Sequence, residues 1–151
     1  MKKLLLVVLA FVFGFAVTNA AEKRGTPAQA EAMVKKAIEF LKANGKDKAF
    51  AAFSDQKGKF VDGDLYVMVY DMNGKCVAHG ANAKMIGKDL IDMKDADGKL
   101  FVKERVEIAK TKGKGMQNYK WTNPTNKQIE AKTAYIQKVD DVIVCSGAYA
   151  K

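Results

Sequence analysis

Residues 65–79 read LYVMVYDMNGKCVAH, and this stretch decides the fold class. The run LYVMVY has the apolar and aromatic composition of a β-strand. Asn73-Gly74 is typical of a two-residue type I′ turn, so a second strand is expected over 76–79. The sequence therefore predicts an antiparallel β-hairpin near the middle of the chain.

The turn also predicts which residues of the hairpin face each other. Counted outward from it, the pairs are Asp71 with Cys76, Tyr70 with Val77, Val69 with Ala78, and Met68 with His79. Because side chains alternate along a strand, one face of the hairpin is aliphatic and the other is mixed aromatic and polar. The mixed face carries Tyr66, Met68, Tyr70, Val77 and His79, and the aliphatic face carries Leu65, Val67, Val69, Cys76 and Ala78.

Helical patterns precede the hairpin, and a crossover and three more strands follow it. Thr26, Pro27 and Gln29 are typical of a capping box and predict a long amphipathic helix to about residue 43. The other expected elements are a helix over 46–53, a loop over 54–63, a loop over 81–97 with a helical turn around 88–91, a helix over 99–111, and strands over 115–121, 129–139 and 142–149.

This order of elements favours an α+β domain built on a five-stranded antiparallel sheet. The long N-terminal helix is expected to cover one face of the sheet, and the crossover is expected to cover part of the other. A ligand pocket is expected between the sheet and the crossover.

The start of the chain differs from the rest. The protein has 151 residues, 48% of them hydrophobic, and a net charge of +9, which indicates one globular domain. Residues 1–20 are typical of a secretory signal peptide, because lysines precede the apolar run 4–17 and small residues flank a cleavage point after Ala20. An uncleaved anchor is the alternative, although the run is short for a membrane span. We therefore expect a signal peptide, 1–20, and one periplasmic or secreted domain, 21–151.

Several function classes are disfavoured. Export and the lack of a helix-turn-helix, zinc-finger or RNP-like motif make nucleic acid an unexpected partner. His79 is the single histidine and Cys76 lacks the second cysteine of a haem attachment motif, so no metal and no cofactor are expected. Since no nucleophile elbow, phosphate loop or zinc-protease motif is present, we do not expect an enzyme.

A set of segments, in this order and at these spacings, resembles the single Cache domain, an extracytoplasmic relative of the PAS fold found in bacterial sensors. The segments are 64–75, Ala78-His79-Gly80 with 87–90, 95–98, Tyr119-Lys120-Trp121 with Asn123-Pro124, 132–135 and Gly147-Ala148-Tyr149. The resemblance covers nearly all of 21–151. It implies a five-stranded sheet in the order 2-1-5-4-3, with a long N-terminal helix packed on it.

The resemblance also implies a function. Family members typically bind small organic acids or other small metabolites, and usually signal through a second membrane helix to a kinase or chemotaxis module. This sequence ends at Lys151, directly after the last expected strand, so we expect a free binding domain. Its expected partners are a small-molecule ligand, in particular a carboxylate, and a membrane sensor protein; a homodimer along the long helix is left open. The alternative is an envelope protein-interaction module with a vestigial pocket and a lysine-rich surface.

The candidate ligand-binding residues come from the strands that flank the expected pocket. Lys132 resembles the family's lysine at the start of the fourth strand, where it would meet a ligand carboxylate. Tyr119 and Trp121 share a face and suit an apolar wall with polar tips, with core packing as the alternative. The full set is Lys132, Tyr119, Trp121, Tyr135, Tyr70, His79 and Met68. Strict alternation separates Lys132 from Tyr135, so both line one pocket only if Lys132 precedes the regular pleat or a bulge intervenes.

The implied strand order also bears on the two cysteines. The strands that carry Cys76 and Cys145 would lie on either side of the first strand, about 9.6 Å apart. This separation exceeds the usual Cα limit of about 7 Å for a disulfide. Two free, buried thiols are therefore expected.

Overall fold

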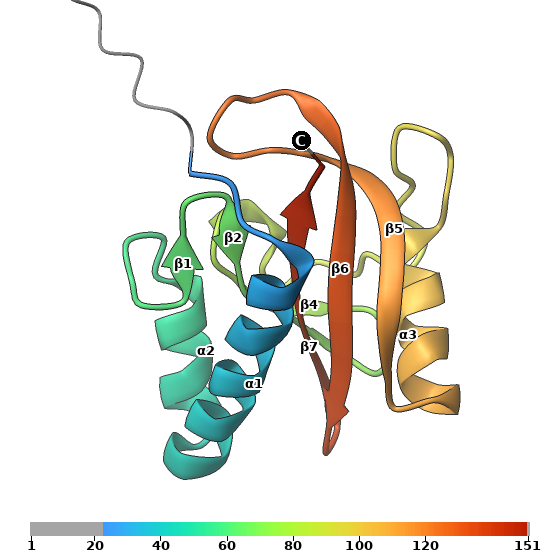
Figure 1. Ribbon diagram of the computed structural model, residues 1–151. Helices are drawn as coiled ribbons and strands as arrows, with labels where there is room; N and C mark the ends of the chain where they lie inside the picture. Colours follow the sequence, from blue (N-terminus) through green and yellow to red (C-terminus); the bar gives the residue numbers. More distant parts are fainter. Residues whose placement is uncertain (1–22, 151) are drawn as a thin grey trace, which may run out of the picture.

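The computed structural model describes residues 23–150, and the expected signal peptide, residues 1–20, lies outside this range. The described residues form an α+β domain with a five-stranded antiparallel sheet in the order β4-β3-β7-β6-β5 (Figure 1). Numbered along the chain, these strands have the order 2-1-5-4-3, as the resemblance implied. Within 23–150, no helix has the length and apolar content needed to cross a bilayer.

The elements mostly follow the predicted boundaries. In chain order they are α1 (Pro27–Asn44), α2 (Lys46–Ser54), β1 (Val61–Asp62), β2 (Leu65–Tyr66), β3 (Met68–Asp71), β4 (Cys76–His79), the 3-10 helix η1 (Ala83–Met85), α3 (Phe101–Thr111), β5 (Lys114–Thr122), β6 (Ile129–Val139) and β7 (Val142–Tyr149). Three predictions of elements are wrong. The run 65–70, expected as one strand, is divided into β2, which belongs to a separate two-stranded sheet, and β3 of the five-stranded sheet. The expected loop 54–63 contains β1, which pairs with β2, and the helical turn of the crossover lies at η1 rather than at 88–91.

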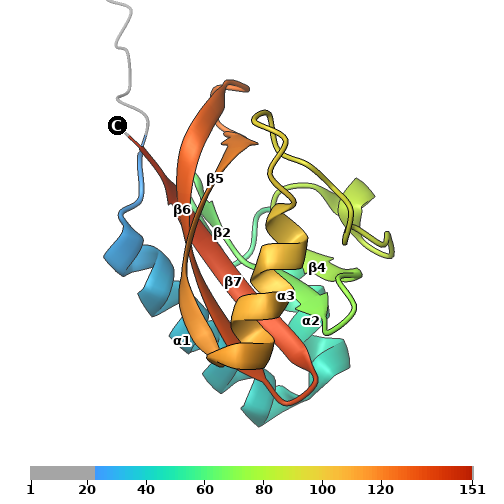
Figure 2. The same ribbon diagram turned by 90° about the vertical axis from the view of Figure 1, so that its right-hand side faces the viewer.

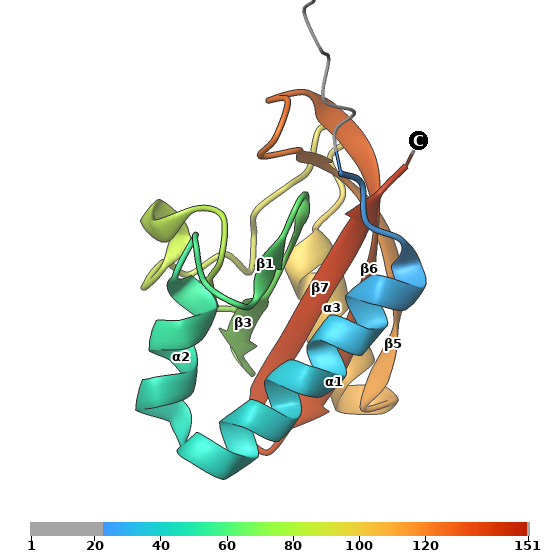
Figure 3. The ribbon, with the colours of Figure 1, turned by 60° about the vertical axis from the view of Figure 1, so that its left-hand side comes forward.

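The sheet separates two layers of helix. Helix α1 begins at the predicted capping box, in which Thr26 and Gln29 cap each other's backbone N–H groups. Figure 3 shows α1 and α2 in front of the sheet, and Figure 2 shows α3 on the opposite face. The α1 layer buries an apolar cluster that includes Val67 and Val69 of the predicted aliphatic face.

The hairpin turn departs from the predicted register. Gly74 N–H donates to Asp71 O and Asp71 N–H donates to Lys75 O, so the loop contains three residues rather than two. Gly74 has a φ of 93°, a conformation that glycine adopts readily and that this longer turn uses. The extra residue produces a bulge, and Tyr70 faces Cys76 instead of Val77. The pairs Met68 with His79 and Val69 with Ala78 are confirmed.

The bulge moves Cys76 to the other face of the hairpin. Cys76 packs in the cluster that contains Met68 and Tyr70, whereas Val77 packs with the α1 layer, the reverse of the prediction. The cluster with Cys76 lies between the sheet, α3 and the crossover, and we call it the crossover-side cluster. Its crossover and α3 members are Met85, Leu90, Phe101, Val102, Val106 and Ala109.

Candidate functional site

The crossover-side cluster surrounds two basic side chains, those of Arg105 from α3 and Lys132 from β6. Arg105 is 0% exposed and Lys132 is 1% exposed. Over residues 23–150, neither side chain has a carboxylate oxygen within salt-bridge distance. Burial of a charged group without an opposite charge is costly, and such groups gather where a protein binds or reacts. This pair therefore marks the candidate site.

Arg105 is held on one edge of its guanidinium group. Its Nε and Nη2 donate to Gln117 Oε1 at 3.2 and 3.0 Å. Gln117 Nε2 in turn donates to Phe101 O and to a carboxylate oxygen of Glu104, which fixes the amide orientation. Nη1 of Arg105 is buried and has no hydrogen-bond partner in the described part of the chain. One donor edge is thus left available.

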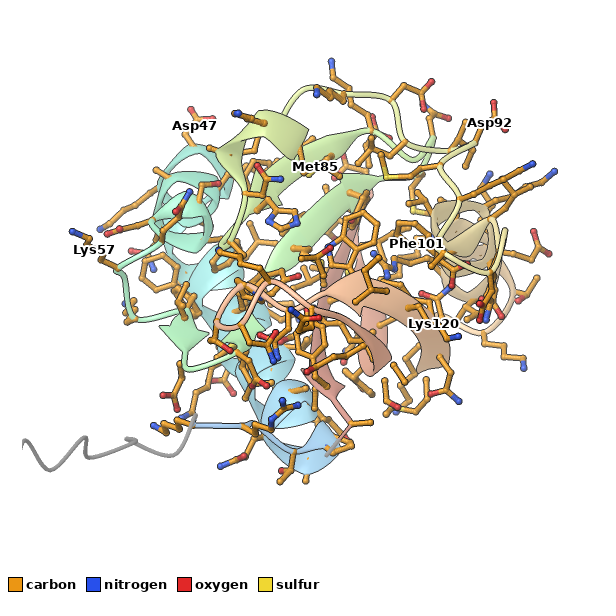
Figure 4. The ribbon with its side chains drawn as sticks, turned by 90° about the horizontal axis from the view of Figure 1, so that it is seen from above. Asp47, Lys57, Met85, Asp92, Phe101 and Lys120 are labelled. Atoms are coloured by element: carbon orange, nitrogen blue, oxygen red, sulfur yellow. The ribbon has the colours of Figure 1, made fainter. Side chains whose placement is uncertain are left out.

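Aromatic rings surround the same guanidinium. Its Cζ lies 5.0 Å from the centre of the Tyr70 ring, 5.2 Å from that of Tyr119 and 5.5 Å from that of Phe101. Phe101 also stacks on Tyr119, with 4.9 Å between ring centres. In Figure 4, Phe101 and Met85 lie on the crossover side of the domain, while Lys57 and Asp92 lie at its periphery. Cation–π contacts hold the charge in place but do not neutralise it.

Lys132 lies between two tyrosines across the sheet. In the strand register, Lys132 is paired with Tyr119 on β5 and with Tyr149 on β7. Its Nζ lies 3.9 Å from the centre of the Tyr66 ring and 4.5 Å from that of Tyr149, and it donates to Tyr149 Oη at 3.4 Å. Burial lowers the pKa of Lys132 well below its ordinary value of 10.5, and the charge of Arg105 lowers it further.

A glycine makes room for the Lys132 side chain. A Cβ at Gly147 would lie 2.8 Å from Cε of Lys132 and 3.0 Å from backbone atoms of Thr133 and Ala134. Such approaches are closer than van der Waals contact allows. Gly147 therefore permits the lysine to fold across β7 toward the tyrosines.

Two tyrosine hydroxyl groups lie between the lysine and the end of β5. Tyr149 donates to Thr122 O at 2.8 Å, and the hydroxyls of Tyr66 and Tyr149 are 3.2 Å apart. Since the Tyr149 proton is used at Thr122, Tyr66 is the donor to Tyr149. Burial raises the pKa of both phenols, so both remain protonated.

His79 lies beside Tyr66, with 5.1 Å between their ring centres. Its Nδ1 accepts hydrogen bonds from the backbone N–H groups of Ala81 and Asn82 at 3.2 and 3.0 Å. The ring proton of the neutral form is therefore on Nε2. Burial lowers the pKa of His79 to about 3, and the charges of Lys132 and Arg105 contribute. The imidazole is a neutral donor at physiological pH.

A cavity of about 320 Å³ opens beside these residues. It is lined by Tyr66, His79, Ala81, Asn82, Trp121, Thr122, Pro124 and Lys127. Tyr66 forms a wall of the cavity on one side and contacts Lys132, so a small molecule that enters here lies one aromatic ring away from the lysine.

The structure brings together six of the seven predicted site residues. Lys132, Tyr119, Trp121, Tyr70, His79 and Met68 all lie on the crossover side of the sheet. Tyr135 does not: it packs in the α1-side cluster, and its hydroxyl donates to Gln137. The regular pleat of β6 separates it from Lys132, so the prediction that Tyr135 lines the pocket is corrected.

The set of predicted residues lacks Arg105, Gln117, Tyr66 and Tyr149. A signal for Arg105 was available in the sequence, because it lies four residues after Phe101 and four before Ala109, on the apolar stripe of its helix. An arginine on the apolar stripe of a helix is expected to be buried, because this stripe packs against the core. Strand alternation placed Tyr66 on the mixed face of the hairpin with His79, which was a signal for it, whereas Tyr149 has no comparable signal, since aromatic residues are common in strands.

These features together define a PAS-like Cache sensor domain: a long N-terminal helix, a sheet in the order 2-1-5-4-3, and a polar site between the sheet and the crossover. The family model for Single Cache domain 2 matches residues 17–151, and the chain belongs to this family. Cache sensor domains are extracytoplasmic ligand-binding modules of receptors rather than enzymes.

Two curated relatives are sensory proteins. The chain is 37% identical over 90 residues to the methyl-accepting chemotaxis protein McpP of Pseudomonas putida, and 32% identical over 88 residues to the sensor histidine kinase MctS of Rhizobium johnstonii. The matches cover 58% and 57% of this chain. They cover 16% and 19% of the relatives, so the chain spans less than a fifth of their length.

Solved structures agree with this assignment. A periplasmic sensor domain of a chemotaxis protein is similar with a TM-score of 0.71 and 26% identity, covering 83% of this chain and 95% of that one. A Cache chemosensory domain described for its carboxylic acid recognition is similar with a TM-score of 0.69 and 26% identity, covering 82% and 92%. The chain is thus a Cache sensory domain of the type found in chemotaxis and kinase receptors.

Proposed function

We propose that this domain is an extracytoplasmic sensor that binds a small organic acid, with the ligand carboxylate held between Arg105 and Lys132. The observation that carries this proposal is the burial of both side chains in one cluster, at 0% and 1% exposure, without a carboxylate partner in residues 23–150. A ligand carboxylate would supply the missing negative charge.

Arg105 is the stronger anchor in this proposal. Its guanidinium is always charged, and its unpaired Nη1 can donate to a carboxylate oxygen in a charge-assisted hydrogen bond. Lys132 adds a second donor from the other side of the cluster. Because the ligand carboxylate stabilises the ammonium form, we expect binding of a simple acid to restore the lysine's proton.

The walls of the site limit the rest of the ligand. Tyr70, Tyr119 and Trp121 are aromatic, so they favour a short apolar carbon chain. Hydroxyl groups of Tyr66 and Tyr149 and the neutral His79 favour a ligand with an additional hydrogen-bond acceptor. Small monocarboxylates fit this combination. The similar Cache domain described for carboxylic acid recognition supports the same ligand class.

The sensory context is part of the proposal. We infer that residues 1–20 export the domain to the periplasm, where ligand occupancy is read by a membrane chemoreceptor or kinase. The relation to McpP and MctS supports this role. A homodimer along α1 stays a prediction.

A thermal-shift screen tests the ligand class. The purified protein is heated with acetate, propionate, lactate or pyruvate, and with amines of the same size. A ligand that binds only the folded state adds about 2.7 kcal/mol at a hundredfold excess over Kd, which raises Tm by several degrees. We expect acids to raise Tm and amines to leave it unchanged.

Two variants make the screen specific to the site. Arg105→Met replaces the guanidinium group by an apolar side chain and should abolish the shift. Lys48→Met removes an exposed lysine of α2 and should preserve it. A flat response to every acid, or an equal response in Arg105→Met, would contradict carboxylate binding here and favour the protein-interaction module.

A further inference from the structure

The crossover has two halves that are attached to the sheet in different ways. Residues 86–90 are bonded to the hairpin by backbone groups, since Gly87 N–H donates to Cys76 O and Cys76 N–H donates to Lys88 O. Residues 92–99, which read DMKDADGK, make no backbone–backbone hydrogen bond to the sheet in the described part of the chain. In Figure 1 they form the yellow loop above α3, beside β5. We call residues 92–99 the strap.

Side chains hold the strap to the outer edge of β5. Asp95 Oδ2 accepts the backbone N–H of Lys120 at 2.9 Å, while Oδ1 of the same carboxylate accepts the N–H groups of Asp97 and Lys99. Asp95 therefore bonds the strap to itself and to β5. Two lysines add contacts, from Lys120 Nζ to Asp97 at 3.0 Å and from Lys99 Nζ to Asn118 O at 2.6 Å. No residue of the strap is buried, and segments with few buried contacts open at a low cost in free energy.

The strap adjoins the aromatic rings that surround Arg105. A hollow of about 220 Å³ between the strap and β5 reaches Tyr119, and a second of about 240 Å³ reaches Trp121. Phe101 comes two residues after the strap, stacks on Tyr119, and lies 5.1 Å from Trp121 between ring centres. Since Tyr119 and Phe101 also contact the guanidinium, their rings lie between the strap and Arg105.

The closed site leaves no path for a ligand to the guanidinium. Arg105 is fully buried, and neither Arg105 nor Lys132 lines the cavity of about 320 Å³. A carboxylate therefore reaches Arg105 only after an element has moved. On the cavity side the intervening ring is that of Tyr66, which is buried and bonded through its hydroxyl to Tyr149. The strap is the more loosely packed neighbour of the site.

We propose that the strap opens to admit the acid and closes over the occupied site, and that Asp95 sets the rate of opening by bonding the strap to β5. This inference rests on the proposed function, since it concerns access to the same site. Asp95 is a positioning residue in this scheme and does not touch the ligand. Its bond to Lys120 N–H stabilises the closed form of the empty and of the occupied domain alike. Loss of this bond should therefore raise the rates of binding and release together and leave Kd unchanged.

Stopped-flow fluorescence measures the opening. Trp121 is the single tryptophan of the chain, and it lines both the hollow beside the strap and the cavity of about 320 Å³. Movement of the strap should therefore change its emission. The purified protein is mixed with increasing concentrations of propionate. If opening precedes binding, the observed rate approaches a limiting value that equals the rate of opening, whereas direct access predicts a rate that rises linearly with propionate.

Two variants remove the bond from opposite sides. Asp95→Ala removes the acceptor, and the limiting rate should rise about tenfold, as expected for loss of a hydrogen bond to a charged group. Lys120→Pro removes the donor at an edge position whose N–H bonds to Asp95 rather than to β6, where proline is tolerated, and it should have the same effect. Calorimetric titration should give the same Kd for propionate in both variants and in the unsubstituted protein.

Two further variants are controls. Lys120→Met keeps the N–H donor and loses the ammonium group, so it isolates the contribution of the contact with Asp97. Asp92→Ala removes an exposed carboxylate of the strap that has no hydrogen bond or ion pair within residues 23–150, and it should leave the limiting rate unchanged. Because Asp95→Ala and Lys120→Pro could disturb folding, the limiting rate in the unsubstituted protein is the deciding measurement.

The outcomes separate this inference from carboxylate binding. A rate that rises linearly with propionate, with the same slope in Asp95→Ala, would show that the acid enters by another route and would overturn the inference while leaving the carboxylate site intact. A limiting rate that is the same in Asp95→Ala would overturn the role of Asp95, and calorimetric binding without a change in Trp121 emission would overturn movement of the strap. Failure of propionate and pyruvate to bind at all would overturn the proposed function as well.

Discussion

Lys132 and Tyr149 face each other across β6 and β7, and the lysine Nζ donates to the tyrosine Oη at 3.4 Å. The pair is also connected to β5, because Tyr149 donates to Thr122 O at the end of that strand. Lys132 is therefore connected through Tyr149 to the ends of both β5 and β7. This is the region where the N-terminal segment is anchored, since Arg24 donates to Ala150 O.

A buried lysine that serves a ligand should reduce the stability of the empty domain. We expect Lys132→Met to raise the free energy of unfolding by about 1 kcal/mol, because an apolar side chain of similar length removes the cost of burying an unpaired amine. The same variant should weaken binding of small acids. Urea unfolding and calorimetric titration measure the two effects.

Lys48→Met is the control for this substitution, since Lys48 is exposed on α2. It should change neither quantity. A loss of several kcal/mol in Lys132→Met would instead assign the lysine a structural role.

Gly147 should be essential for the position of Lys132. In Gly147→Ala the new Cβ meets Lys132 Cε at 2.8 Å and neighbouring backbone at 3.0 Å, so the lysine or the strand must move. We expect a loss of about 1–3 kcal/mol in stability together with weaker acid binding. Gly115→Ala creates a similar contact, 2.9 Å to Ile108, away from the site. If both variants bind acids equally well, the position of Lys132 does not limit affinity.

Local sequence patterns predicted the elements well because each element carries its own signals. The capping box at Thr26 fixes the start of α1, and the turn at Asp140-Asp141 separates β6 from β7. The hairpin register was missed because the side-chain pattern is the same for a two-residue turn and a three-residue turn. The two turns differ in the backbone at Asn73, which a type I′ turn would place at positive φ; among the non-glycine residues of 23–150, only Lys127 and Asp140 have a positive φ.

The candidate site was harder to predict for a related reason. Lys132 came from the resemblance, while Tyr119 and Trp121 came from strand alternation. Arg105 was missed because the candidate residues were taken from the strands alone, although its place on the apolar stripe of α3 indicated burial. Tyr135 was included among the ligand-binding residues although strand alternation separates it from Lys132. The regular register of β6 agrees with this alternation.

Low pH should weaken the contact that anchors the N-terminal segment at Arg24. Glu130 accepts a two-point hydrogen bond from Arg24 and further bonds from Asn123 and Asn126, and these hold its pKa at about 2 against an ordinary 4.5. Because the folded-state pKa is depressed, the stabilisation is present above about pH 4.5 and is lost as the pH falls toward 2. Glu130→Gln should therefore be less stable than the unsubstituted protein at pH 7, with a difference that shrinks across this window.

The Glu130 prediction is checked by urea unfolding at pH 7, 4 and 2. A double-mutant cycle with Arg24→Met isolates the ion pair, and the effect of Glu130→Gln should be smaller in the Arg24 variant. A difference that stays constant from pH 7 to 2 would contradict the assignment.

Both cysteines should be free, and their reactivity should report on the site. Cys76 and Cys145 are buried thiols of the crossover-side cluster, and burial raises the pKa of Cys76 to about 12 and also raises that of Cys145. We expect a thiol reagent to modify both after unfolding without reductant, and to modify the folded protein slowly, because the cluster must open first.

An acid that binds only the closed state should slow the modification of the folded protein about a hundredfold at a hundredfold excess over Kd. Modification of fewer than two thiols in the unfolded, unreduced protein would contradict the free-thiol assignment, and an unchanged rate with ligand would place the acid elsewhere.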